Sequence, residues 1–162
     1  MYKVAIITAS DKGYAGERED KSGSVIEEIV TAHELEVTGK VILPDDRQIL
    51  SDQMLNYCHQ GIDLILTTGG TGFSKRDVTP EATADIVERR ADNLTFAMIA
   101  NSLQYTPKAM LSRGIAGIRE NTLIVNLPGS PKAVRENLEY AIDAIIHGVK
   151  ILKDDDAECA RK

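Results

Sequence analysis

The sequence is poor in the features that mark several classes of protein. Its two cysteines, Cys58 and Cys159, have a spacing that fits no metal-binding or redox motif. Acidic residues outnumber basic ones by 25 to 19 and no basic stripe is present, which argues against a nucleic-acid partner. No apolar run approaches membrane-spanning length, and the N-terminus lacks the pattern of a cleavable signal. These absences predict a cytoplasmic protein with no membrane partner.

What the chain does contain is typical of one globular domain. Its 162 residues are 43% hydrophobic and 27% charged, which suffices for a single core and is too little for two. We expect one domain over residues 1–153, followed by a charged C-terminal tail over residues 154–162.

Short apolar runs alternate with amphipathic stretches along the chain. They predict strands over residues 4–8, 35–43, 62–67, 115–118 and 122–127. Helices are predicted over residues 22–33, after Asp46, after Pro80, over residues 94–103 and from Pro131. This alternation predicts a mostly parallel sheet that is covered by helices on both faces.

Local residues add detail to this pattern. Ser24 and Glu27 form a capping box for the first helix, and residues 12–21 before it are predicted to be an exposed, mobile loop. Gly39 indicates a bulge in the second strand, and Gly61 a helix end.

The stretch from Leu64 to Gly72 organises the rest of the chain. An apolar run ends there in three glycines, which let backbone N–H groups approach a ligand closely. Thr79 is predicted to cap the next helix, with Pro80 at its first position. Such a strand–loop–helix unit can receive a phosphate. The alternative is a plain tight turn, for which one glycine would suffice.

Four predicted strands end in loops of polar or special residues. The carboxyl ends of parallel strands meet at one edge of a sheet, where ligands bind. The sequence therefore predicts one site with glycine-lined anion cradles and several carboxylates. The loops are 10–11, 44–46, 68–77 and 126–130.

Carboxylates beside an anion cradle call for a cation between them. Mg²⁺ is commonly held by one or two carboxylates together with substrate phosphates. Asp45, Asp46 and Asp77 therefore suggest magnesium-assisted phosphoryl or nucleotidyl transfer, and the absence of His and Cys from these loops argues against a covalent nucleophile. The alternatives are helix capping for Asp45 and Asp46, and for Asp77 capping or an ion pair with Arg76. The Gly-Gly-Thr-Gly run is neither a Walker A nor a dinucleotide motif.

Six short motifs in a linked order make the pattern far more specific. They are Asp20–Gly23, Pro44–Asp45, Thr67–Gly72, Arg76–Ala82, Met110–Arg113 and Leu127–Pro131. Together they resemble the molybdopterin adenylyltransferase family, the MogA/MoaB type that is related to the G domain of gephyrin. The resemblance extends from about Val4 to Leu152.

The resemblance implies a three-layer α/β/α sandwich with a mostly parallel central sheet, and a homotrimer. The implied reaction transfers AMP from MgATP to the terminal phosphate of molybdopterin, which attacks the α-phosphate of ATP and releases pyrophosphate. ATP and molybdopterin are then substrates, Mg²⁺ is the cofactor, and the product would pass to a molybdenum insertase.

The resemblance also implies roles for particular residues. Asp45 and Asp77 match the acidic pair that acts around Mg²⁺ and substrate. Nucleotide or phosphate contacts fall on Ser10, Asp11, Gly69, Gly70, Thr71, Gly72, Gly129 and Ser130. Pterin contacts fall on Ser102, Ser112 and Asn126.

One dipeptide departs from the family pattern, because many members have Pro-Gly where this chain has Asp92-Asn93. We expect Asn93 to replace glycine in a left-handed turn and Asp92 to add negative charge near the anion site.

Two other functions fit the same motifs. One is a non-catalytic molybdopterin-binding or carrier module, against which the intact Asp45 and Asp77 argue. The other is a hydrolase of another pyrophosphate compound. The complete Thr79-Pro80 and Pro128–Pro131 motifs favour the adenylyltransferase.

Overall fold

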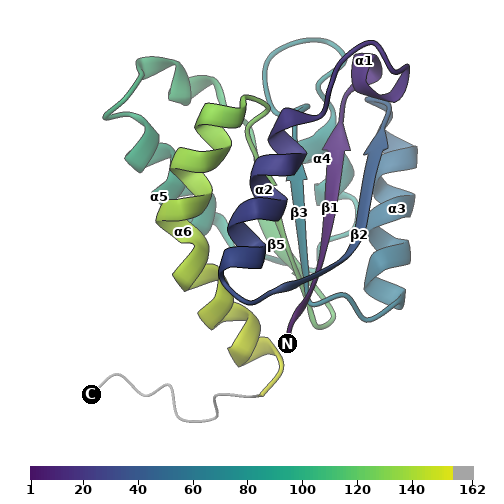
Figure 1. Cartoon of the computed structure of the whole chain (residues 1–162), viewed down its shortest axis with the longest axis vertical. Coiled ribbons are helices and arrows are strands. Elements are labelled where there is room, and N and C mark those ends of the chain that lie inside the picture. The colour runs from purple at the N-terminus through teal and green to yellow at the C-terminus, as the bar shows by residue number, and fades with distance from the viewer. Residues whose placement is uncertain (155–162) are drawn as a thin grey trace.

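The computed structural model describes residues 1–154 and shows a six-stranded sheet between two layers of helices (Figure 1). The strands are β1 (Lys3–Ala9), β2 (Glu36–Leu43), β3 (Leu64–Thr68), β4 (Arg89–Arg90), β5 (Ala116–Arg119) and β6 (Thr122–Leu127). The helices are α1 (Asp11–Tyr14), α2 (Lys21–Ala32), α3 (Arg47–His59), α4 (Thr79–Ala84), α5 (Asp92–Ser102), the 3₁₀ helix η1 (Pro107–Leu111) and α6 (Pro131–Leu152). None of the helices in this part of the chain is long and apolar enough to cross a membrane.

The sheet is mostly parallel, as the sequence predicts. Its order is β2-β1-β3-β6-β5-β4, in which β2, β1, β3 and β6 are parallel and the last two strands are antiparallel. The carboxyl ends of the four parallel strands therefore lie at one edge. The predicted bulge is also present, because Val4 pairs with Val37 and Ala5 with Gly39, so Thr38 is the extra residue.

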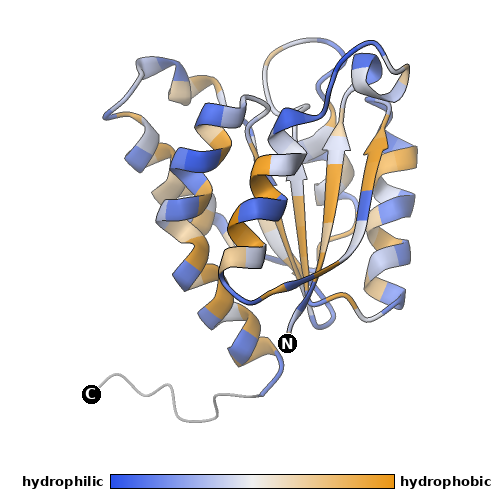
Figure 2. Cartoon of the chain, viewed as in Figure 1, coloured by the Kyte–Doolittle hydropathy of each residue, from blue (hydrophilic) through white to orange (hydrophobic). Residues whose placement is uncertain are grey.

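Each face of the sheet has its own core, which the alternation of side chains along β1 shows. Val4 and Ile6 pack with α2, α5 and α6, whereas Ala5 and Ile7 pack with α3 and α4. All four side chains are completely buried. The central strands β1, β3 and β6 are accordingly mostly apolar, while the helices carry hydrophilic residues on their outer faces (Figure 2). This confirms the three-layer fold.

The helix boundaries correct several predictions. The capping box at Ser24 is wrong: α2 begins at Lys21, and Asp20 caps it by accepting a hydrogen bond from the Gly23 N–H at 2.9 Å. Ser24 instead donates to the carbonyl of Asp20. The predicted loop over residues 12–21 is exposed but contains α1. Gly61 does follow the end of α3, with a φ of +76°.

The region around Asp92 also differs from expectation. The helix after Pro80 ends at Ala84, and the exposed strand β4 follows it. The residues on either side of β4, Glu88 and Ala91, donate backbone hydrogen bonds to β5. Asn93 lies inside α5 and is not among the residues with positive φ in the described chain. Asp92 pairs with Arg90 at 2.9 Å and lines neither of the two cavities described below, so its charge is neutralised locally. Apart from Asp154, the predicted tail lies outside the described residues.

Candidate functional site

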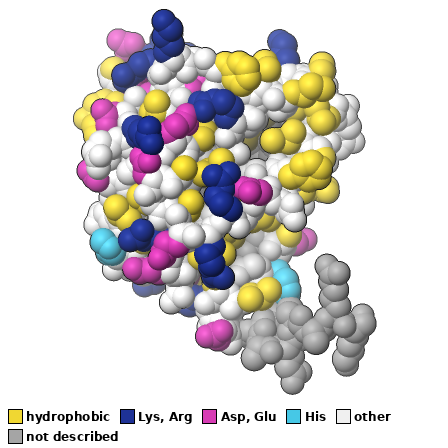
Figure 3. All heavy atoms as spheres, turned by 180° about the vertical axis from the view of Figure 1, so that it is seen from behind, with side chains coloured by type: hydrophobic (Ala, Val, Ile, Leu, Met, Phe, Trp, Pro, Cys, Tyr) yellow, Lys and Arg dark blue, Asp and Glu magenta, His cyan; other side chains and the backbone are white. Residues whose placement is uncertain are grey.

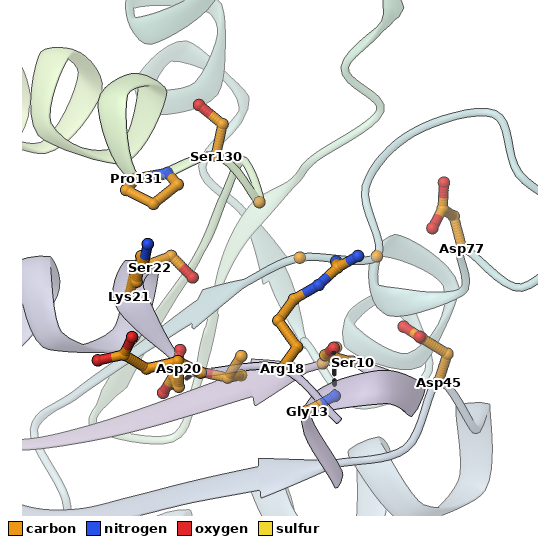
Figure 4. A pocket seen from close by; sticks show the side chains of 16 residues that line it. Ser10, Gly13, Arg18, Asp20, Lys21, Ser22, Asp45, Asp77, Ser130 and Pro131 are labelled. Carbon is orange, nitrogen blue, oxygen red and sulfur yellow. Dashed lines mark hydrogen bonds between the residues drawn. The ribbon is translucent and has the colours of Figure 1, made fainter. Parts of the chain in front are cut away.

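A cavity of about 720 Å³ opens at the carboxyl edge of the parallel strands (Figure 4). Residues from all four predicted loops line it. They include Ser10, Asp45, Gly69, Gly70, Asp77, Gly129 and Ser130. The strand order therefore brings together segments that are more than 100 residues apart in the sequence, and we refer to this space as the larger cavity.

Threonines at the strand ends hold the surrounding loops in place. The Thr8 hydroxyl donates to Asp20 Oδ2 at 2.9 Å, which fixes the start of α2 against β1. The Thr68 hydroxyl donates to the carbonyl of Pro128 at 2.7 Å, which fixes the loop before α6 against β3. Both threonines are buried, so these hydrogen bonds satisfy groups that would otherwise be costly at the end of a strand. The cavity walls are thus tied to the sheet.

Two glycines shape the floor of the larger cavity. Gly69 and Gly70 have φ angles of +86° and +69°, which a side chain rarely tolerates. A Cβ on Gly69 would overlap the carbonyl oxygen of Ala9, and one on Gly70 would overlap Thr79 Oγ1. The loop can therefore pass this close to its neighbours only because these two positions are glycine.

Asp45 is held by a reciprocal pair of hydrogen bonds with Asp11. The Asp11 N–H donates to Asp45 Oδ2 at 3.1 Å, and the Asp45 N–H donates to Asp11 Oδ1 at 3.0 Å. Arg76 donates to both Asp11 oxygens at 3.0 Å and lowers the pKa of that carboxyl. Burial, together with the charges of Asp11 and Asp77, raises the pKa of Asp45. Asp11 thus lies behind Asp45 and does not line the cavity.

The structure distinguishes Asp45 from Asp46, for each of which the sequence left open either helix capping or a role in the site. Asp46 caps α3 by accepting a hydrogen bond from the Ile49 N–H at 2.9 Å, and it does not line the cavity. Asp45 caps no helix. Its Oδ1 is buried and, within residues 1–154, has no hydrogen-bond partner.

The hydroxyl of Thr79 is the other buried polar side-chain atom in the described chain that has no partner. The sequence predicted it as a helix cap, but Val78 occupies the cap position and Thr79 is the first residue of α4. An ideal Cβ on Gly70 would lie against this hydroxyl and 3.1 Å from Asp45 Oδ1, so both unpaired atoms face the same glycine. Buried polar atoms without partners are rare in proteins and mark a place where a ligand or ion can supply the partner.

Asp77 lies on the same side of the larger cavity as Asp45 (Figure 4). Its Oδ2 accepts a hydrogen bond from the Ser74 N–H at 3.0 Å, so it closes a turn of its own loop and does not pair with Arg76. Arg113 fixes the loop from outside by donating to the carbonyls of Gly72 at 2.7 Å and Asp77 at 2.8 Å. The same guanidinium pairs with Glu81 of α4. The sequence placed Arg113 in a motif but gave it no role.

A second cavity of about 380 Å³ lies between α5, η1 and α6 and is called the smaller cavity here. The three predicted pterin contacts, Ser102, Ser112 and Asn126, all line it. The glycine loop is divided between the two cavities, because Gly69 and Gly70 line the larger one whereas Thr71 and Gly72 line the smaller. Ser130 caps α6 and lines both.

Most polar groups of the smaller cavity already have partners. Asn126 donates to the hydroxyls of Thr67 and Thr83 at 3.0 Å, and its Oδ1 accepts from the Ile115 N–H at 3.1 Å. Its buried side chain therefore links β3, α4 and the residue that precedes β5. Ser102 donates to Asn137, which the sequence analysis missed because α6 brings it there from 35 residues away.

Large apolar side chains are exposed around the smaller cavity. Seen from behind, hydrophobic side chains gather at the corner of the molecule formed by α5 and η1 (Figure 3). They are Phe96, Leu103, Tyr105, Met110 and Leu111. We call them the apolar corner.

The chain is similar to known proteins in sequence and in fold. Residues 5–148 match the family described as "Probable molybdopterin binding domain". Gephyrin from Dictyostelium discoideum is 41% identical over 92% of the chain, which spans only 22% of gephyrin's length. The molybdopterin adenylyltransferase of Helicobacter pylori J99 is 38% identical over 92% of the chain and 86% of its own length. The crystal structure of the molybdopterin biosynthesis enzyme MoaB from Thermus thermophilus superposes with a TM-score of 0.89 at 42% identity, covering 94% of this chain and 96% of that one.

Proposed function

The chain belongs to the molybdopterin-binding domain family, and from this premise we propose that it is a molybdopterin adenylyltransferase of molybdenum cofactor biosynthesis. The observation that carries the proposal is the pair of adjoining cavities. The larger has a glycine floor and the carboxylates Asp45 and Asp77, the smaller has neutral polar and apolar walls, and Ser130 belongs to both. A nucleotide in the larger cavity and a pterin in the smaller would meet at the glycine loop.

The residues fit the magnesium ion that such a reaction needs. Asp45 Oδ1 is buried and unpaired, and carboxylate oxygens are the ligands that Mg²⁺ prefers. Within residues 1–154, no group of three or more His, Cys, Asp or Glu side chains is arranged to hold a metal. Asp45 and Asp77 would therefore share the ion with the phosphates of the nucleotide. When bound, Mg²⁺ neutralises charge on those phosphates.

The protein's own part in the proposed reaction is to bring the two reactants together and orient them. The terminal phosphate of molybdopterin forms a bond to the α-phosphorus of ATP, and the bond to pyrophosphate breaks. The nucleophile is already an anion, so no general base is required. Gly69 and Gly70 admit the phosphates close to the backbone, and Asp11 holds Asp45 in place. Positioning and charge stabilisation are the expected sources of rate in transfers at phosphorus.

Replacement of Asp77 by asparagine tests the proposal. Asp77→Asn keeps the size of the side chain and an acceptor for the Ser74 N–H but removes the charge. We expect pyrophosphate release with molybdopterin and MgATP to fall by at least about 100-fold, because one electrostatic contact in an active site is worth several kcal/mol. The exposed Asp143 on α6 offers the matched control Asp143→Asn, which should retain full activity.

The same assay separates the alternatives. Wild-type turnover by the Asp77→Asn protein would remove Asp77 from the mechanism. A wild-type protein that binds molybdopterin but releases no pyrophosphate would instead be the carrier module. A wild-type protein that shows neither property and instead hydrolyses another pyrophosphate compound would be the hydrolase.

The proposal includes the assembly that the family resemblance implies. The apolar corner supplies side chains that a homotrimer could bury, and sedimentation in solution tests this; a monomer at micromolar concentration would remove it. A cytoplasmic location and hand-over of the product to a molybdenum insertase complete the proposed function.

A further inference from the structure

The segment between α1 and α2 carries a guanidinium group, that of Arg18, at the mouth of the larger cavity. The backbone on both sides of it is fixed. The Glu17 N–H donates to the carbonyl of Lys12 at 2.9 Å, and the carboxylate of Asp20 is held by Thr8 and Gly23. Arg18 is therefore anchored through its neighbours while its own side chain stays exposed.

The side chain of Arg18 points into the cavity. Figure 4 shows it extending from its loop to the middle of the space, with Asp45 and Asp77 on one side and Ser22 and Ser130 on the other. Within residues 1–154 it forms no hydrogen bond or ion pair. The two other arginines of the site differ in this respect, because Arg76 is paired with Asp11 and Arg113 with Glu81.

More acidic than basic residues line the larger cavity, so an unpaired cation there is important for binding an anion. Four acidic residues line it, against only Arg18 and Lys21. A triphosphate adds more negative charge than one divalent ion can neutralise, so a bound nucleotide needs another positive group. Guanidinium suits this task because it donates two parallel hydrogen bonds to phosphate oxygens and is always charged. The four acidic residues are Glu19, Asp20, Asp45 and Asp77.

We propose that Arg18 contacts the polyphosphate tail of the nucleotide in the larger cavity, opposite Asp45 and Asp77. The contact places positive charge where negative charge grows as pyrophosphate leaves. This inference rests on the proposed function, and it names the residue that makes the larger cavity select a triphosphate over a monophosphate.

Calorimetric titration of the full chain with ATP and with AMP, each in MgCl₂, tests the inference. The test variant is Arg18→Gln, and the matched control is Arg89→Gln, which removes the same charge from an exposed residue of β4 outside the cavity. Arg18→Gln should weaken ATP binding about tenfold or more, as expected for a charge-assisted hydrogen bond. AMP binding should change less than about twofold, because AMP lacks the tail. Arg18→Lys should restore part of the loss, and Arg89→Gln should change neither ligand.

Each other outcome overturns a defined part of the inference. If the wild type binds ATP and Arg18→Gln binds it equally well, Arg18 makes no contact, while the proposed function stands. If Arg18→Gln weakens ATP and AMP alike, the variant disturbs the cavity as a whole. If Arg89→Gln has the same effect as Arg18→Gln, the long-range field and not a contact is responsible. A wild type that binds no ATP removes the proposed function and the role of Arg18 together.

Discussion

The two cavities are built by different means although they share a wall. The larger lies where four parallel strands end, so its lining is backbone, glycine and charged loop residues such as Asp45 and Asp77. The smaller lies between α5, η1 and α6, and side chains such as Met98 and Ser102 line it. A sheet edge suits a charged chain of phosphates, whereas a groove between helices suits a flat ring. The comparison indicates that a substitution on one side should leave the other side largely unaffected.

The largest expected effect is at Gly70, the floor of the larger cavity. Gly70→Ala combines a positive φ with a Cβ that would overlap Thr79 Oγ1 and approach Asp45 Oδ1. We expect the free energy of unfolding to fall by about 3 kcal/mol, of which the φ angle accounts for roughly 1–2 kcal/mol. Urea denaturation measures the loss. Binding of ATP should be lost with it, while the smaller cavity keeps its ligand.

Gly61 provides the matched control for this substitution. Its φ of +76° is similar, but a Cβ there would meet no atom within 4 Å. Gly61→Ala should therefore cost only about 1 kcal/mol. If the two variants lose the same free energy of unfolding, the overlap of a Cβ at Gly70 with its neighbours costs nothing. The close packing around the floor of the larger cavity would then not require glycine.

The next prediction concerns Asp45. Its replacement should change the free energy of unfolding less than that of Gly70 does, and should raise it. Burial, with the charges of Asp11 and Asp77, raises the pKa of Asp45 above the ordinary 3.8. A raised carboxyl pKa means that the folded state binds its proton more tightly, so this group lowers stability as the pH rises from about 3.8 through the raised value. Asp45→Asn should therefore stabilise the protein at pH 7 by about 1 kcal/mol while abolishing activity.

Denaturation of both proteins across a pH series tests whether Asp45→Asn raises the free energy of unfolding at pH 7. The advantage of Asp45→Asn over the wild type should shrink as the pH falls through the raised pKa of Asp45. Asp46→Asn is the control, because Asn caps a helix as well as Asp does and should change stability little at any pH. If the Asp45→Asn protein is less stable than the wild type at neutral pH, the partly buried carboxylate of Asp45 does not destabilise the fold.

The sequence predicts the larger cavity much better than the smaller one. Apolar runs and glycines reveal strand ends, and the parallel order follows from the alternation of strands and helices, so the loops of Asp45 and Asp77 could be placed together in advance. The pattern could not distinguish Asp45 from Asp46, because only the three-dimensional path shows which carboxylate caps α3. The strand β4 was missed because two exposed arginines show no apolar alternation.

The walls of the smaller cavity depend on how helices pack, which local pattern does not encode. Ser102 and Asn137 are 35 residues apart, and only the packing of α5 on α6 brings their side chains together. Asn126, which is predicted to contact a pterin, lines the smaller cavity, and its amide also joins three separate segments of the fold. Arg18 showed no motif at all, because its distinguishing property is the absence of a partner in the folded, described chain.

The smallest expected effect is at Ser102, and it measures how separate the cavities are. Ser102→Ala leaves the buried Asn137 Oδ1 without its donor, which costs about 1 kcal/mol, whereas alanine gains roughly 0.5 kcal/mol in helix propensity. The net loss of about 0.5 kcal/mol should appear in urea denaturation, and ATP binding should stay within about twofold of wild type.

Ser24→Ala, on the exposed face of α2, is the control for serine removal from a helix. Water can replace its exposed hydrogen bond to the Asp20 carbonyl, so this variant should lose no stability and should leave ATP binding unchanged. Because Ser130 lines both cavities, a disturbance could still pass between them through the start of α6. Ser102→Ala would then weaken ATP binding several-fold at almost unchanged stability. That result would mean that the shared wall couples the nucleotide to the second substrate, and the two cavities would have to be treated as one site.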